Sequence, residues 1–255
     1  MTVEVSYSVD GPADAPVVVL SNSLGADRGM WDPQVPALAE RYRVVTYDTR
    51  GHGRSPVPAG PYSIDDLTDD LVALLDRLDV RRASVVGLSL GGMTAMRLAA
   101  RDPERVDRLV LLCTSAHIGG TTYAERAVVA RAEGTAKLAP AVVERWLTPG
   151  YAAGHADVVA RLEAMVAGTP DEGYAGCCDA LAVLDLREDL ARIAAPTLVV
   201  SGAEDPALPP EHQQRIVEGI ANSSLLTVTP AAHLANVEQP LQVTGAILGH
   251  LEESR

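Results

Sequence analysis

Apolar residues along the chain form two kinds of run: short β-branched stretches, and longer stretches with apolar positions three and four residues apart. The short runs are mostly continuous rather than alternating, which is typical of strands covered on both faces in a parallel sheet. The longer runs have the period of amphipathic helices. The predicted strands are 3–9, 17–20, 43–47, 84–87, 108–113, 197–201 and 225–228, and the predicted helices include 65–80, 91–103 and 209–220.

Strands and helices alternate along most of the chain, which predicts an α/β protein with a mostly parallel central sheet flanked by helices. The alternation breaks between about 118 and 190, where the pattern is helical and contains no strand candidate. We expect residues 1–117 and 191–255 to form one core, and residues 118–190 to form a helical insertion over the sheet.

Composition narrows the classes of protein that this pattern allows. A chain of 255 residues that is 47% hydrophobic can bury one large core with an insertion. The formal net charge of -13 disfavours nucleic acid and anionic membranes as partners. An anionic substrate would therefore need a local cation in its pocket.

The cysteines and the N-terminal segment indicate in which cellular compartment the protein is expected. Cys113, Cys177 and Cys178 are odd in number and lack metal-ligand spacing, which favours a reducing environment. The first residues carry acids instead of a basic leader, and no run of 18 apolar residues occurs. These features predict a cytoplasmic protein.

A serine between glycines, in the stretch GLSLGG, follows the fourth predicted strand. Gly87 and Gly91 lie two residues on either side of Ser89, and a helical pattern begins directly afterwards. Small residues there allow a sharp strand-to-helix turn that exposes the middle side chain in a strained conformation. The G-x-S-x-G spacing predicts a nucleophile elbow, whereas the spacings of a dinucleotide fingerprint and of a phosphate-binding loop are both missing.

A serine hydroxyl is a poor nucleophile at neutral pH, so the elbow predicts a histidine base and an orienting carboxylate later in the chain. Among the six histidines, His233 follows the last predicted strand, in a loop from which a base can reach a serine at a strand end. The others lie in a tight turn, before or within the insertion, in a helix or near the terminus: His52, His117, His155, His212 and His250.

The carboxylate candidates follow the penultimate predicted strand. Asp205 directly precedes Pro206, whose ring fixes the turn and with it the direction of the carboxylate. Glu204 is the alternative, but the shorter side chain before proline is the more rigid. The competing position, after the strand that follows the elbow helix, reads LLCTSAH and contains no carboxylate. We therefore predict Asp205 as the orienting acid.

These stretches together resemble the α/β-hydrolase fold family over essentially the full chain. The elbow GLSLGG, the turn YDTRGHGRS and the loops SGAEDPALPP and AAHLANVEQP carry the resemblance. It implies a helical cap inserted after the sixth strand of the sheet. More narrowly, LSNSLGADRGMWDPQVPAL, PYSIDDL, EGYAGCCDAL and AHLANVEQP look like the 3-oxoadipate enol-lactonases of aromatic catabolism. The short N-terminus departs from that family and leaves the first strand of the usual sheet in question.

Acyl transfer needs two N–H donors for the oxyanion. The backbone N–H of Leu90, which follows the nucleophile, is expected to be one of them. The loop VVLSNSLGADRGMW, anchored at Trp31, aligns without a gap with the His-Gly-x-Gly loop common in these hydrolases. This alignment places Asn22 where the histidine usually stands and makes Leu24 the second donor, with Ser23 as the alternative.

The resemblance implies a serine hydrolase that opens a small anionic enol-lactone to 3-oxoadipate in the β-ketoadipate pathway. Ser89 would attack the lactone carbonyl while His233 takes its proton, and the ring would open with an enol as leaving group. Water activated by His233 would then release the acyl group. We expect no metal and no organic cofactor.

The helical insertion offers three cations for the substrate carboxylate. Arg126 and Arg131 lie in ERAVVARAEG, and Arg145 lies beside Trp146 in ERWLTP. We expect Arg131 and Arg145 to bind the carboxylate and Trp146 to line the pocket. The expected partner is a small anionic lactone, not nucleic acid or a membrane, and the expected assembly is a monomer or small homo-oligomer.

Two other functions are compatible with the same residues. An α/β-hydrolase esterase or a cofactor-free perhydrolase would share the triad, and only the insertion and the SNSLG loop argue against it. A binding module that has lost hydrolysis could keep the fold. Such a module is expected to lack a member of the triad, and all three candidates are present.

Overall fold

The computed structural model describes residues 1–252. Within this range, seven strands form one sheet in the order β1-β3-β2-β4-β5-β6-β7. The first strand runs antiparallel to β3, and all other neighbours are parallel. The strands are β1 (Tyr7–Asp10), β2 (Val17–Ser21), β3 (Arg43–Tyr47), β4 (Ala83–Leu88), β5 (Val106–Leu112), β6 (Thr197–Gly202) and β7 (Ser223–Val228).

Burial along the strands explains the pattern of apolar runs. All residues of β4 and β6 are buried, as are nearly all of β5, because helices cover both faces of the sheet. The edge strands β1 and β7 are largely exposed or half-buried. The continuous apolar runs thus correspond to the central strands, as expected for a parallel sheet.

The predicted strand over 3–9 is wrong in its first half. Only Tyr7–Asp10 pairs with β3. Before it, the N–H of Val3 donates to Asp70 Oδ1 at 2.7 Å, and the N–H of Ser6 donates to Ser55 Oγ at 2.8 Å. Side chains from distant segments therefore accept from these two N–H groups, while the carbonyl oxygen of Ser6 accepts from the N–H of Asp48, directly after β3, at 2.9 Å.

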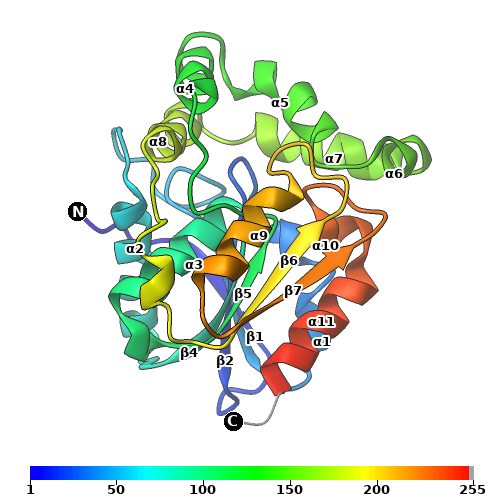
Figure 1. Cartoon of the computed structure of the whole chain (residues 1–255). Coiled ribbons are helices and arrows are strands. Elements are labelled where there is room, and N and C mark those ends of the chain that lie inside the picture. The colour runs from blue at the N-terminus through cyan, green and yellow to red at the C-terminus, as the bar shows by residue number, and fades with distance from the viewer. Residues whose placement is uncertain (253–255) are drawn as a thin grey trace.

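Helices lie on both sides of the sheet (Figure 1). On one side are α2 (Ile64–Arg77), α3 (Leu90–Arg101) and α9 (Pro210–Gly219), which correspond to the three predicted helices. On the other side, α1 (Val35–Ala39) packs against α11 (Pro240–Glu252). Within residues 1–252, no helix has both the length and the apolar character that a membrane crossing requires.

The insertion is helical, as predicted, and lies over the end of the sheet at which the parallel strands finish (Figure 1). It follows β5, the fifth strand, rather than the sixth strand that the resemblance implied. The count differs by one because a single strand, β1, comes before β2 in this sheet, where the resemblance implied one strand more. Its helices are α4 (Thr122–Glu133), α5 (Thr135–Glu144), α6 (Pro149–Gly154), α7 (Ala156–Ala167) and α8 (Asp171–Ala182).

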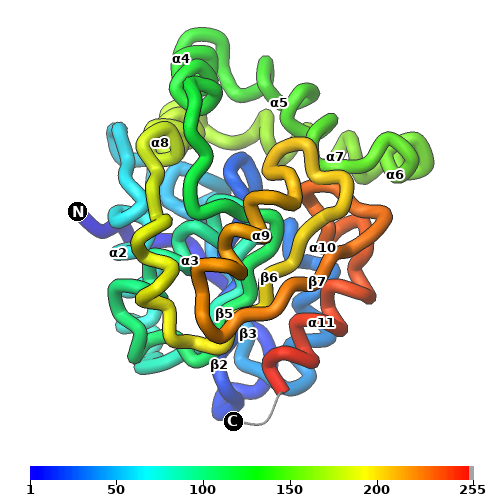
Figure 2. The backbone as a smooth tube through the Cα atoms, in the orientation of Figure 1, coloured from blue at the N-terminus to red at the C-terminus, as the bar shows by residue number. Residues whose placement is uncertain are grey.

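Helix α8 docks directly on the turn that follows β3, and Figure 2 shows the backbone of the insertion returning toward the sheet after this helix. A Cβ atom on Gly173 would lie 2.0 Å from the carbonyl oxygen of Gly51, so the two backbones touch with no room for a side chain. The N–H of Gly60 donates to Glu172 Oε1 at 2.9 Å. The insertion is thus fixed to the core at its C-terminal helix.

Candidate active site

Ser89 occupies the turn between β4 and α3 with φ 54° and ψ -115°, a conformation that non-glycine residues rarely adopt. A Cβ on Gly87 would lie 2.3 Å from the carbonyl oxygen of Gly91, and a Cβ on Gly91 would lie 2.1 Å from that of Ser21. Both glycines are therefore required by close backbone approach. The N–H of Ser89 donates to Leu112 O at 2.9 Å, which fixes the turn at the ends of β4 and β5.

His233 and Asp205 form a buried pair beside the elbow. Asp205 Oδ2 lies 2.8 Å from His233 Nδ1, and Asp205 Oδ1 accepts from the N–H groups of Ala207 at 2.8 Å and Leu208 at 3.0 Å. Because the carboxylate accepts, Nδ1 carries the proton and Nε2 is left as the basic nitrogen. Glu204 is exposed. The pair therefore uses the aspartate before proline.

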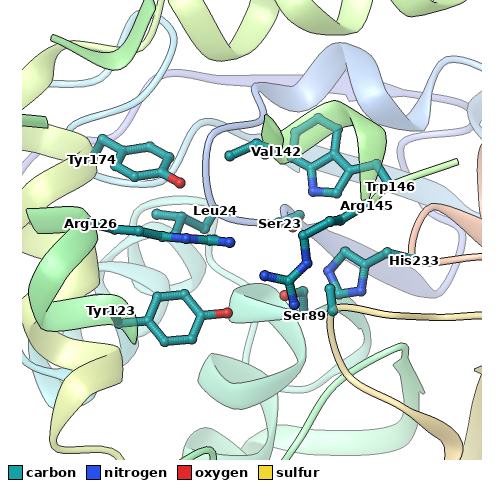
Figure 3. Close-up of a pocket in the computed structure, with 11 residues that line it drawn as sticks. Ser23, Leu24, Ser89, Tyr123, Arg126, Val142, Arg145, Trp146, Tyr174 and His233 are labelled. Carbon is teal, nitrogen blue, oxygen red and sulfur yellow. The ribbon is translucent and has the colours of Figure 1, made fainter. Parts of the chain in front are cut away.

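Ser89 and His233 line the same cavity, between the elbow and the insertion, and their side chains lie next to each other in Figure 3. The cavity volume is about 20 Å³, which is room for about one water molecule. The insertion thus nearly closes over the serine. The other lining residues are Ser23, Leu24, Tyr123, Arg126, Val142, Arg145, Trp146, Tyr174 and Ala207.

The loop after β2 distinguishes the two candidate oxyanion donors. The N–H of Ser23 donates to Met30 Sδ at 3.3 Å, and the N–H of Gly25 donates to His52 Nε2 at 3.0 Å. Leu24 lies between them, and its N–H has no acceptor within residues 1–252. The N–H of Leu90 opens α3, where the first amides have no partner inside the helix. Leu24 and Leu90 are thus the available donors beside Ser89.

Two buried side chains hold this loop in place. Asn22 Nδ2 donates to Tyr47 O at 2.7 Å, and Trp31 Nε1 donates to Asn22 Oδ1 at 3.0 Å, so Asn22 ties the loop to β3. His52 donates from Nδ1 to Arg50 O at 3.1 Å and accepts at Nε2 from the loop. Burial lowers the pKa of His52, which favours this neutral form. The sequence marks His52 only as part of a tight turn and gives no signal of this contact.

The structure places Arg131, one of the two cations expected to bind the substrate, outside the cavity that holds Ser89. Arg131 does not line the cavity, and its guanidinium donates to Glu172 Oε2 at 2.9 Å and to Asp179 Oδ2 at 2.7 Å. It is therefore occupied by two carboxylates of α8. Arg145 and Trp146 do line the cavity, and Arg145 Nη2 also donates to Pro206 O at 2.9 Å.

Arg126 faces the cavity without a carboxylate partner within residues 1–252 (Figure 3), as does Arg145, whose guanidinium donates to a backbone carbonyl instead. The guanidinium carbon of Arg126 lies 5.3 Å from the ring centroid of Tyr123. The buried hydroxyl of Tyr174 lines the same cavity and makes no hydrogen bond of normal geometry within the described chain. Burial raises the pKa of both tyrosines, so both hydroxyls keep their protons and can donate. The cavity therefore presents two guanidinium cations and two hydroxyl donors.

The three cysteines are free and buried. Burial raises the pKa of Cys178 to about 12 and also raises those of Cys113 and Cys177 well above their usual value, which keeps the thiols protonated and unreactive. Within residues 1–252, no group of three or more His, Cys, Asp or Glu side chains is arranged to hold a metal ion.

Known proteins share this architecture and sequence. Residues 16–240 match the family described as alpha/beta hydrolase fold. The 3-oxoadipate enol-lactonase 2 of Acinetobacter baylyi is 41% identical over 246 residues, which cover 96% of this chain and 92% of that protein. The RutD protein of Variovorax paradoxus, whose name proposes carbamate hydrolysis, is 34% identical to this chain. The aligned residues cover 96% of this chain and 95% of that protein.

A solved structure agrees with these relatives. The crystal structure of the enol-lactonase from Burkholderia xenovorans LB400 matches with a TM-score of 0.96 and 41% identity, over 98% of this chain and 96% of that chain. The resemblance inferred from the sequence is thus confirmed. The chain belongs to the α/β-hydrolase fold family, and 3-oxoadipate enol-lactonases are among its relatives.

Proposed function

We propose that the protein is a serine hydrolase that opens 3-oxoadipate enol-lactone to 3-oxoadipate through an acyl-enzyme on Ser89. The observation that carries this proposal is the cavity in which the elbow serine and its histidine face an arginine that has no carboxylate partner in the described part of the chain. A partly buried guanidinium is costly unless an anion pairs with it, which favours an anionic substrate. The names of the enol-lactonase relatives support the choice of lactone.

In the proposed acylation step, Ser89 Oγ attacks the lactone carbonyl and His233 Nε2 takes the hydroxyl proton. Asp205 holds Nδ1 in the donating tautomer and stabilises the imidazolium that forms. The N–H groups of Leu24 and Leu90 bind the oxyanion, and each such donor lowers the barrier by about 3 to 4 kcal/mol.

Ring opening breaks the bond between the carbonyl carbon and the ring oxygen. The enol oxygen departs with the proton from the His233 imidazolium, and the enol then tautomerises to the ketone. Because the leaving group belongs to the same molecule, it stays attached to the acyl-enzyme. Water then gives a proton to His233 Nε2 and attacks the ester carbonyl. The bond from this carbon to Ser89 Oγ breaks, Oγ takes the proton back from His233, and the product leaves as a carboxylate.

We assign the substrate carboxylate to Arg126, with the Tyr174 hydroxyl as a second donor. Arg126 has no carboxylate partner within residues 1–252, and the Tyr174 hydroxyl is available for the same anion. Arg145 is the alternative cation, although it already donates to the backbone of Pro206. Trp146 supplies an apolar wall of the cavity.

The second candidate function is hydrolysis of a carbamate or of another ester. It is favoured by the identity of 34% to a RutD protein, and the triad geometry would serve either reaction. A substrate without a carboxylate would leave Arg126 unpaired.

We also propose a cytoplasmic location, because the three cysteines are unpaired.

The proposal is tested by comparing kcat/KM for 3-oxoadipate enol-lactone, p-nitrophenyl acetate and a small alkyl carbamate with the purified protein. A hydrogen-bonded ion pair contributes about 1.5 to 3 kcal/mol, so the lactone should exceed the uncharged ester by at least about 10- to 100-fold. A higher value for the carbamate or the ester would overturn the assignment and favour the second candidate.

A further inference from the structure

Glu238 is a buried carboxylate that the proposed reaction does not use. It is the last residue of α10 (Ala235–Glu238), and only 5% of it is exposed. Its Oε1 accepts from the N–H of Ala232 at 2.6 Å, and its Oε2 accepts from Thr148 Oγ1 at 2.6 Å and from the Thr148 N–H at 3.1 Å. Three donors therefore converge on an acceptor-only group, in charge-assisted hydrogen bonds.

These three bonds join two distant parts of the chain. Ala232 directly precedes His233 in the loop between β7 and α10. Thr148 caps the start of α6 in the insertion, and its side chain also accepts from the N–H of Tyr151. Glu238 thus links the backbone before the histidine to the insertion.

A second bond joins the same two segments on the other side of the histidine. The N–H of Leu234 donates to Trp146 O at 2.9 Å. The residues on both sides of His233 are therefore tied to segment 146–148, one through Glu238 and one directly. Trp146 also lines the cavity, so the wall that contacts the substrate and the loop that carries the base share one set of supports.

We infer that Glu238 is a positioning residue that couples segment 146–148 of the insertion to the loop that carries His233. The inference rests on the proposed role of His233 as the base. That loop has no regular secondary structure, and its other backbone contacts include the bonds from Glu204 N–H to Ala231 O at 2.9 Å and from Gln239 Nε2 to Pro230 O at 2.8 Å. Weakening either end of the Glu238 link lets the imidazole move relative to Ser89. Displacement of a catalytic group by about 1 Å lowers turnover by up to about 100-fold.

The test compares variants at both ends of the link. Glu238→Gln keeps the size but turns one acceptor into a donor that faces donors, and Thr148→Val removes the hydroxyl without touching the histidine loop. Each should lower kcat for p-nitrophenyl acetate and for the enol-lactone by about 10- to 100-fold, with KM changed less than about 3-fold. Thr148→Ser, which keeps the hydroxyl, should restore kcat.

The double variant and a matched control complete the test. If the two residues act as one link, the double variant should be no slower than the slower single variant. Thr121 donates to Glu125 at 2.6 Å on the exposed surface of the insertion, so Thr121→Val removes a similar bond away from the histidine and should leave kcat unchanged. Additive losses in the double variant would overturn the coupling. So would a Thr148→Val protein with a lowered Tm and normal kcat at 25 °C.

The ester assay separates this inference from the proposed function. If Ser89→Ala abolishes ester hydrolysis while both Glu238→Gln and Thr148→Val keep normal kcat, the inference alone fails. If Ser89→Ala retains ester hydrolysis, the proposed mechanism fails whatever the Glu238 variants do. Should Glu238→Gln not fold, the comparison of Thr148→Val with Thr148→Ser still decides the question.

Discussion

Arg126 and Arg131 lie on the same helix, α4, but have different partners. Arg131 donates to two carboxylates of α8 and contributes to holding two helices of the insertion together. Arg126 has no such carboxylate within residues 1–252 and faces the cavity beside the Tyr174 hydroxyl. At the scale of single residues, the different pairing of the two guanidinium groups is the basis for assigning the substrate carboxylate to Arg126 rather than Arg131.

Replacing each arginine with methionine tests this difference while preserving much of the side-chain volume. Arg126→Met should raise KM for the enol-lactone by about 10- to 100-fold and change kcat much less, because it removes binding common to the ground state and the transition state. Steady-state kinetics measure both constants. Arg131→Met is the matched control and should leave KM unchanged. A larger KM effect in Arg131→Met would return the carboxylate to the residue expected from the sequence.

At the scale of elements, three loops at the ends of parallel strands bring the reactive groups together. The elbow after β4 presents Ser89, the loop after β6 presents Asp205, and the loop after β7 presents His233. Helix α8 fixes the insertion above them through the contact between Gly173 and Gly51. The height of the insertion over the serine thus depends on two residues without side chains.

The close contact between Gly173 and Gly51 predicts that adding one methyl group lowers the stability of the protein. In Gly173→Ala the new Cβ would meet the Gly51 backbone, and overpacking of this kind costs about 1 to 3 kcal/mol. For a chain of this size, that lowers Tm by about 2 to 12 °C in a thermal melt. Gly150→Ala is the control, since a Cβ there meets nothing within 4 Å and alanine favours a helix. Equal Tm values in the two variants would contradict the proposed close packing.

At the scale of the whole molecule, the sequence predicted the features that depend on local pattern. The central strands appear within one or two residues of their expected ends, because burial on both faces leaves a continuous apolar run. The elbow serine, the aspartate before proline and the histidine after the last strand meet at one edge of the sheet, because parallel strands finish at the same edge.

The features that the sequence did not predict depend on distant partners. Residues 3–6 have a strand pattern, but side chains from distant segments take hydrogen bonds that a strand would make. The carboxylate partners of Arg131 were not predicted, because the positions of Glu172 and Asp179 relative to α4 follow from helix packing. The link from Glu238 to Thr148 joins residues 90 positions apart, and no local pattern marks it.

The most direct test of the account follows the ultraviolet absorbance of freshly prepared 3-oxoadipate enol-lactone at neutral pH, corrected for spontaneous opening. We expect rapid loss with the wild-type protein, and a fall in kcat of at least about 10⁴-fold in Ser89→Ala, because the triad acts as a unit. Loss of absorbance at the uncatalysed rate, with p-nitrophenyl acetate still cleaved, would contradict the substrate assignment. Full activity in Ser89→Ala would contradict the nucleophile.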